Sequence, residues 1–335
     1  MFWLEVGIPT IRDRVVQQAI LNRMEKIFEP KFSEVSYGFR VGRSCHQAIR
    51  KIEEHLASGC QWIVEVDMEK FFDTVNHELL IDLVNEEISD GRVLRLIRKF
   101  LTSGMMEEMK IEYQTNGTPP GGVISPLLAN IYLQPFDEEM TQEGFRVVRY
   151  ADDIVVLCQS KAESLRAKAK VLEILEGKLR LKVSSEKTKV THLSSGFEFL
   201  GFVFRLSYKY PRFKWQDAFR DKIRFATRRK RPKTMFQIIE EINPIIRGWG
   251  NYFACGNCYR IYYALDKWLR RRIQVFKAKR WASDNWRKYP DEVLRNKGLI
   301  SLVELLKAKP GQLELFPVKG QRLREAEYGK SVCSV

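Results

Sequence analysis

Two adjacent acids, Asp152 and Asp153, lie between two apolar runs and constrain the fold more than any other feature of the chain. Residues 145–148 and 154–158 are rich in β-branched apolar side chains, so together they predict a buried β-hairpin. Carboxylates at the tip of such a hairpin would repel each other and lack water unless a cation joined them. Mg²⁺ prefers oxygen ligands of this kind. A solvated Asp-Asp turn is the alternative for this stretch alone.

Length and charge bound the class of protein. The 335 residues suffice for two to three domains and a sizeable core. Lys and Arg number 57 against 42 Asp and Glu, and the net charge of +15 suits a phosphate-rich partner. An anionic membrane surface would attract the same charge, but no apolar run approaches the roughly 18 residues that span a bilayer, and no signal peptide is visible.

The six cysteines are scattered, which argues against a disulfide framework and fits a reducing compartment. Cys255 and Cys258 form a C-x-x-C pair without a second Cys or His pair at ligand spacing. We interpret them as two thiols in a turn between helices, with a zinc site as the less favoured alternative.

Helices and strands are expected to alternate up to about residue 205. Strands are expected at 62–67 and 190–193, with a hairpin or buried strand at 197–204. Ser160 and Glu163 predict a capping box, and the helix after it should bury Leu165, Ala169, Leu172 and Leu175. Further helices are expected to begin near Asp13, Ser44, His77, Arg92 and Leu127.

Three other stretches carry candidate functional residues. Asp67 ends the strand 62–67, where ligands tend to be held. Residues 36–44 form a loop with glycines, Arg40 and Arg43, which is either a surface turn or a clamp on phosphates. Residues 117–126 form a glycine-containing loop, which is either a plain helix entry or a place of close backbone approach to a ligand.

Beyond residue 206 the chain becomes strongly basic. Helices are expected at 234–243, 244–254 and 258–282, the last with basic residues interleaved with Trp268 and Phe276. A solvated helix face is the alternative, but the density of charge favours nucleic acid. The candidate RNA-binding residues are Arg220, Lys222, Arg224, Arg228, Arg229, Lys230, Arg231, Arg270 and Arg271.

Taken together, these stretches resemble the reverse transcriptase/maturase proteins encoded by group II introns. The resemblance rests on the order and spacing of residues 36–44, 66–73, 117–130, 150–153, 186–188 and 199–202, and on residues 247–253, which resemble the maturase thumb signature. It covers roughly residues 7 to 285.

The resemblance implies an α+β fold, a right-hand polymerase. Its parts would be partial fingers at 1–60, a palm with an antiparallel sheet and helices at 61–205, a helical thumb or maturase domain at 206–300, and a tail at 301–335. A fingers segment would interleave at about 90–130.

The resemblance also implies a site. Asp67 and Asp152 would bind two Mg²⁺ ions, with Asp153 beside them and the Met68 carbonyl completing one shell. The ions would lower the pKa of the primer 3′-hydroxyl and stabilise the leaving pyrophosphate. Phe71, Phe72, Lys187 and Gly121 would contact the nucleotide, with Phe72 excluding a 2′-hydroxyl. Arg40, Arg43, Pro120 and Gly122 would contact the template.

The implied function is an RNA-directed DNA polymerase that binds group II intron RNA, extends a DNA primer on an RNA template with dNTPs, and assists splicing and mobility as part of a mobile element. A cytoplasmic, nucleoid-associated bacterial location and no membrane partner are expected.

Two departures from the family pattern favour an alternative. Pro120 stands where the family has glutamine, and residues 1–6 hold no Lys or Arg, as if the chain were N-terminally truncated. An HNH endonuclease domain is also expected to be missing. The alternative is a catalytically impaired, maturase-type splicing factor. A CRISPR-associated reverse transcriptase is a third possibility, against which residues 247–253 argue.

Overall fold

The computed structural model describes residues 9–102, 105–107, 110–112, 122–278, 287 and 289–308. The chain divides into two compact units, Met1–Ser207 and Tyr208–Val335. The first combines helices with an antiparallel sheet, and the described part of the second is mostly helical. The expected α+β fold is confirmed.

The central sheet of the first unit has the strand order β4-β5-β1-β6, and its neighbouring strands are antiparallel. The predicted hairpin is present: Tyr150 pairs with Asp153, and Ala151 turns the chain with a φ of 57°. The strands are β1 (Trp62–Val66), β4 (Arg146–Tyr150), β5 (Asp153–Cys158) and β6 (Lys189–His192).

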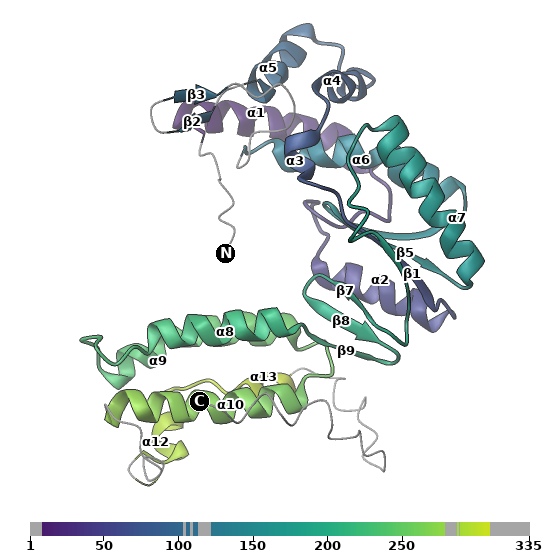
Figure 1. Ribbon diagram of the computed structural model, residues 1–335. Coiled ribbons are helices and arrows are strands. Elements are labelled where there is room, and N and C mark those ends of the chain that lie inside the picture. Colours follow the sequence, from purple (N-terminus) through teal and green to yellow (C-terminus); the bar gives the residue numbers. More distant parts are fainter. Residues whose placement is uncertain are drawn as a thin grey trace. The chain divides into compact units, whose positions relative to one another are not determined.

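Helices cover both faces of this sheet (Figure 1). Val64, Val156 and Cys158 point to one face and share a core with α6 (Ser125–Gln142) and α7 (Lys161–Leu172). Their sequence neighbours must point to the other face, where α2 (Cys45–Ala57) packs on β4 and β5. Burial on both faces explains why β5 is continuously apolar instead of alternating with polar residues.

The other helices of the first unit lie near their expected positions, and their caps show why they begin there. Thr10 accepts a hydrogen bond from the Asp13 N–H, and Ser44 forms a capping box with Gln47. The remaining elements of this unit are α1 (Ile11–Phe28), η1 (Glu29–Lys31), α3 (Phe71–Thr74), α4 (His77–Asn85), α5 (Gly91–Leu101), β2 (Met105–Glu107), β3 (Lys110–Glu112), β7 (Phe197–Phe199) and β8 (Phe202–Arg205).

The predicted core face of α7 is wrong at Leu165 and Ala169 and right at Leu172 and Leu175. Leu165 is 54% exposed and Ala169 is exposed as well. The buried residues are Ser164, Ala167 and Val171, because small side chains let the helix approach the sheet closely. This row of buried residues continues through Ile174 and Leu175 of the π-helical turn η2 (Glu173–Lys178). Leu172 and Leu175 do pack on the core.

The capping box expected at the start of α7 is only half formed. The Ser160 hydroxyl accepts from the Glu163 N–H at 3.1 Å, as predicted. The Glu163 carboxylate, however, accepts from the N–H of Gln159 at 2.7 Å instead of from Ser160.

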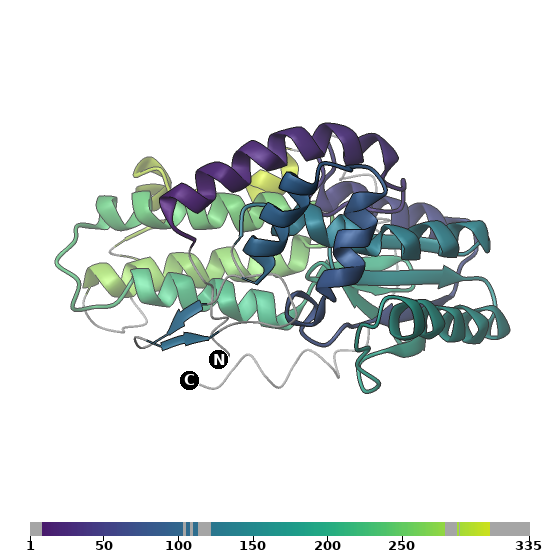
Figure 2. The same ribbon diagram turned by 90° about the horizontal axis from the view of Figure 1, so that it is seen from above.

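In the second unit α8, α9 and α10 lie side by side (Figures 1 and 2). The predicted break at residue 244 is wrong, because α9 runs through Pro244. Pro244 lacks one N–H, but Ile238, Ile242 and Ile246 keep a single buried face across it. The elements are β9 (Tyr208–Pro211), α8 (Phe213–Ala226), α9 (Met235–Phe253), α10 (Tyr259–Ala278), α12 (Asp291–Asn296) and α13 (Leu302–Lys307).

Candidate functional site

Strand pairing brings the three predicted acids to one end of the central sheet. Val66 of β1 pairs with Ile154 of β5, so the next residue, Asp67, comes opposite Asp153. Asp152 lies in the turn that joins β5 to β4. Because side chains alternate along a strand, Asp67 and Asp153 share the face that points away from α6 and α7.

The acids influence one another electrostatically. The pKa of Asp153 is raised to about 6, first because surrounding protein atoms displace water, then by the Asp152 and Asp67 charges. This holds although part of Asp153 is open to solvent. The pKa of Asp152 is also raised, mainly by desolvation and further by Asp67. Asp152 and Asp153, whose charged forms are disfavoured beside Asp67, form with it a site that attracts a cation.

A lysine already contacts this cluster. The Lys187 ammonium lies 3.0 Å from the Asp67 carboxylate, and that hydrogen bond raises the pKa of Lys187. The turn that carries Lys187 is fixed to β1, because the Asp67 N–H donates to the Thr188 hydroxyl at 3.2 Å and the Ser184 N–H donates to the Asp67 carbonyl at 2.8 Å. Lys187 is 69% exposed and is therefore accessible to a ligand.

The Met68 carbonyl is left out of the neighbouring strand pairing. Met68 forms an isolated antiparallel bridge with Val183, but the hydrogen bonds run from Ser184 to Asp67 and from Glu69 to Lys182. In such a pair the central residue directs its own N–H and C=O to the opposite side. The Met68 side chain is buried, so the carbonyl is its available ligand.

The donor set suits Mg²⁺ in its chemistry. Carboxylates and a backbone carbonyl are hard oxygen ligands, and Mg²⁺ commonly takes one or two carboxylates with the remaining positions filled by water and substrate phosphates. Among the described residues, no three His, Cys, Asp or Glu side chains are gathered closely enough to hold a metal ion by themselves. The residues fit an ion that is shared with a substrate.

The two phenylalanines predicted at the nucleotide differ in burial. Phe71 is 2% exposed and belongs to the core, whereas Phe72 is partly buried, with its ring centroid 5.2 Å from that of Phe71. Of the two, Phe72 keeps surface that a ligand can touch.

The glycine loop is only partly visible. Pro120 and Gly121 lie outside the described residues, and Gly122 is buried at the entry of α6. The side chain of Gln17, a buried residue of α1, accepts the Val123 N–H at 2.7 Å and so holds the end of this loop.

The two loop arginines have internal partners. The Arg40 guanidinium donates to the Glu29 carboxylate at 2.9 Å and to the Ser33 carbonyl at 2.6 Å, and its side chain is 5% exposed. It therefore fixes the loop 36–44 from within. Arg43 pairs with Glu34 and lies over the Tyr37 ring, and it remains 23% exposed. Template contact stays a prediction for both.

The predicted RNA-binding residues all lie in the second unit, and some are already paired. Arg220, Arg224, Arg231 and Arg270 each form an ion pair, with Asp217, Asp221, Glu241 and Asp291 respectively, at 2.7–3.0 Å. Five of the predicted residues are exposed to solvent: Lys222, Arg228, Arg229, Lys230 and Arg271.

Helix α8 also presents aromatic side chains beside these basic residues. Trp215 is 49% exposed and Phe225 is 59% exposed, and Arg228 lies 4.6 Å from the Phe225 ring centroid. Exposed cations interleaved with exposed rings are typical of surfaces that bind single-stranded nucleic acid.

Four residues around the hairpin were missed by the sequence analysis: Gly38, Asn130, Asp137 and Arg149. Arg149, Asn130 and Asp137 are each 0% exposed, and the Arg149 guanidinium donates hydrogen bonds to the side chains of both Asn130 and Asp137. A signal was available, because an arginine inside an apolar strand needs a buried acidic partner, and Asn130 and Asp137 interrupt an apolar helix.

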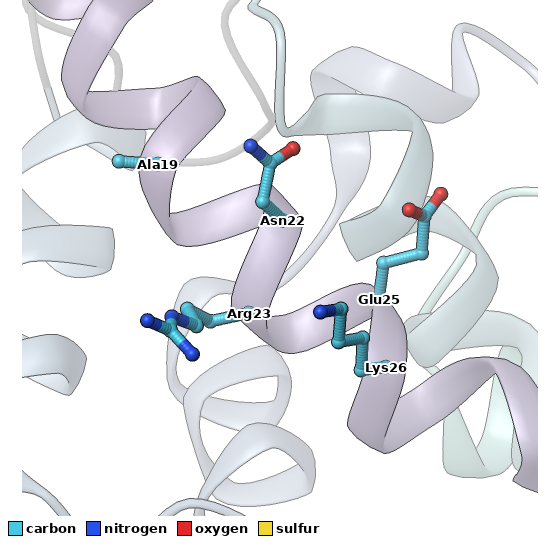
Figure 3. Close-up of a pocket in the computed structure, with 5 residues that line it drawn as sticks. All are labelled: Ala19, Asn22, Arg23, Glu25 and Lys26. Atoms are coloured by element: carbon cyan, nitrogen blue, oxygen red, sulfur yellow. The ribbon is translucent and has the colours of Figure 1, made fainter.

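Other candidate features do not involve the acids. A surface pocket runs along α1 and is lined by Ala19, Asn22, Arg23, Glu25 and Lys26, none of them a predicted site residue (Figure 3). Cys255 and Cys258 occupy the turn between α9 and α10, and Cys258 donates to the Phe253 carbonyl. No helix in the described part of the chain has the length and apolarity to cross a membrane.

Two family profiles match the chain in succession. Residues 3–204 match the family described as reverse transcriptase (RNA-dependent DNA polymerase), which is more than half of the chain. Residues 216–292 match the maturase-specific domain of group II introns.

The chain is also similar to individual proteins. Protein YkfC of Escherichia coli is 35% identical over 235 residues, which are 58% of this chain and 61% of YkfC. The group II intron-encoded protein LtrA of Lactococcus lactis is 31% identical over 265 residues, 60% of this chain and 44% of LtrA. The chain thus spans less than two thirds of either relative. Among solved structures, telomerase from Candida albicans aligns with 90% of this chain and 56% of its own, at 12% identity and a TM-score of 0.47.

Proposed function

Because this chain belongs to the reverse transcriptase family, with the maturase-specific domain of group II introns behind it, we propose that it is an RNA-directed DNA polymerase. It would add dNTPs to a DNA primer on an RNA template. The observation that carries this proposal is the strand register, which sets Asp67 against Asp153 and beside the Asp152 turn.

The acids would bind two Mg²⁺ ions in this activity. Asp67, Asp152 and the Met68 carbonyl would be the protein ligands, with Asp153 beside them. When bound, the ions would supply positive charge that acidifies the primer 3′-hydroxyl and stabilises the leaving pyrophosphate. The carboxylates need to be ionised to do this. The pKa of Asp153 is about 6 in the metal-free chain, and the positive charge of the ions would favour its ionised form.

Nearby side chains would hold the nucleotide. Phe72 of α3 keeps a partly accessible ring and would lie against the sugar. The exposed Lys187 ammonium, held at Asp67, would move to the triphosphate and stay with the pyrophosphate as it leaves. Lys187 would exchange the Asp67 carboxylate for a phosphate, so its ammonium would keep an anionic partner throughout.

The basic second unit would bind group II intron RNA and assist splicing and mobility. The exposed cations and rings of α8 support this part of the proposal. A cytoplasmic location near the nucleoid belongs to the same proposal. The non-catalytic alternative is not favoured, because the profile that matches more than half of the chain describes a polymerase and both acidic stretches are present.

The test is primer extension on an RNA template with Mg²⁺, comparing the wild type with Asp152→Asn combined with Asp153→Asn. The double substitution removes two of the three carboxylates without changing their size, so extension should disappear. RNA affinity should remain close to the wild-type value, since the basic residues lie in the other unit. Extension by the double variant at the wild-type rate would contradict the assignment of the acids.

A further inference from the structure

Arg149 occupies the centre of a buried polar cluster directly behind the acidic turn. Its Nε donates to both Asp137 carboxylate oxygens, at 2.8 and 3.0 Å. Its Nη1 donates to the Asn130 side-chain oxygen at 2.9 Å and to the Ala151 carbonyl at 3.1 Å. Ala151 is the residue that turns the hairpin, so one planar guanidinium fixes the turn to helix α6.

The backbone of Arg149 is held as firmly as its side chain. Its N–H donates to the Val35 carbonyl at 2.9 Å, and its carbonyl accepts the Tyr37 N–H at 2.8 Å. Residues 35–37, at the start of this loop, therefore run beside β4 as a strand-like segment paired through Ser36. Displacement of Arg149 would move this loop and the acidic hairpin together.

Gly38 closes the same arrangement from the loop side. Its carbonyl accepts a hydrogen bond from the Asn130 amide at 2.9 Å. A Cβ added at Gly38 would lie 2.2 Å from the Ala151 nitrogen, inside any allowed contact distance. The loop thus touches the turn backbone itself, and no side chain fits between them.

Burial makes this cluster sensitive to substitution. Burial raises the pKa of Asp137, and the Arg149 charge with its hydrogen bonds opposes that rise. Neither partner has access to water, so a replacement must offer the same donors in the same plane. A lysine at residue 149 carries the charge but cannot reach Asp137, Asn130 and Ala151 at once.

We propose that Arg149 is the positioning residue of the acidic site: through Asp137, Asn130 and the Gly38 contact, it sets the place of the turn that carries Asp152. The expected loss of primer extension rests on the proposed polymerase function. The expected displacement of the turn does not, because it concerns the backbone of the metal-free chain. Small errors in the place of a reacting group cost up to about a hundredfold in rate.

Two variants test this in the full-length protein. Arg149→Lys removes the planar fork, and Gly38→Ala pushes on the turn without touching the ion pair. Amide hydrogen exchange of the metal-free protein should become about tenfold faster or more at residues 35–39 and 148–153, together and in both variants. Primer extension should fall by about a hundredfold, and half-maximal activity should require more Mg²⁺.

Matched controls separate positioning from general loss of stability. Gly91→Ala adds the same methyl group where no atom lies within 4 Å. Val171→Ala opens a cavity in the fully buried face of α7 against the same sheet. Neither should move the Mg²⁺ requirement or the exchange of the two segments relative to the rest of the sheet, even if Val171→Ala lowers the Tm as much as Arg149→Lys.

Wild-type exchange at both segments in Arg149→Lys and Gly38→Ala would overturn the proposal. The proposal would also be overturned if Val171→Ala lost as much primer extension as Arg149→Lys at the same Tm and showed an equal shift in its Mg²⁺ requirement. If the wild type extends no primer, the polymerase function fails, and the exchange measurement still decides whether Arg149 positions the turn.

Discussion

At the scale of single residues, the site is defined by carboxylates whose charged form is disfavoured by the surrounding protein. Asp153 is an exposed residue, yet its pKa is raised to about 6 by desolvation and by Asp152 and Asp67. Its ordinary value is 3.8, so folding favours the protonated form between these two pH values. The stability that protonation contributes is complete below about pH 4 and is lost as the pH rises through about 6.

This gives a pH-dependent prediction for Asp153→Asn. The amide cannot ionise, so at pH 7 the variant should unfold with a free energy about 1 kcal/mol higher than the wild type, a value reduced for solvent screening at a partly exposed group. At pH 4 the two proteins should be equally stable. Urea unfolding at both pH values measures this. A difference that stays the same at pH 4 and pH 7 would contradict the raised pKa.

At the scale of elements, the sequence indicated most helices and strands to within a few residues, because caps such as Ser44 and apolar runs such as β5 act locally. It failed where packing decides. Pro244 does not end α9, since its neighbours share one buried face, and Leu165 is exposed because Ser164 and Ala167 approach the sheet instead.

The same limit applies to the site. The acids could be placed from the hairpin pattern, but the Arg149 cluster could not, since its partners Asp137 and Asn130 come from a helix whose rotation only the fold determines.

Helix α13 offers an element-scale prediction. Asp266 of α10 is 4% exposed and accepts from the Ser301 hydroxyl at 2.6 Å and the Leu302 N–H at 2.9 Å, so it caps that helix from another one. Asp266→Ala should lower the free energy of unfolding by about 2–3 kcal/mol, because these donors become buried without partners.

The control for Asp266→Ala is Asp291→Ala. Asp291 forms a half-exposed ion pair with Arg270, and its loss should cost less than about 1 kcal/mol. Equal losses of stability in the two variants, measured by urea unfolding, would remove the capping role of Asp266.

At the scale of the whole molecule, the excess of basic residues predicts salt-dependent RNA binding. Lys222 and Lys230 are exposed residues of the second unit. If both contact phosphates, replacing them with glutamine should reduce the slope of log K against log salt concentration by about 1.4, since each contact to a single strand contributes about 0.7. Binding at several salt concentrations measures this slope.

The charge-matched control is Lys170→Gln with Lys178→Gln. Both lysines already pair with Glu139, at 2.7 Å, in the first unit. The control removes the same net charge, so its slope should stay at the wild-type value. A reduction of equal size in both double variants would mean that net charge governs binding, and that Lys222 and Lys230 make no specific contact.

The central claim is that this chain copies RNA into DNA at Asp67, Asp152 and Asp153. The most direct measurement is to supply the purified wild-type protein with a primed RNA of defined sequence, dNTPs and Mg²⁺, and to sequence the product. We expect DNA complementary to the template, formed by the wild type and absent with Asp67→Asn. An unextended primer from a folded wild-type protein that still binds the RNA would contradict it.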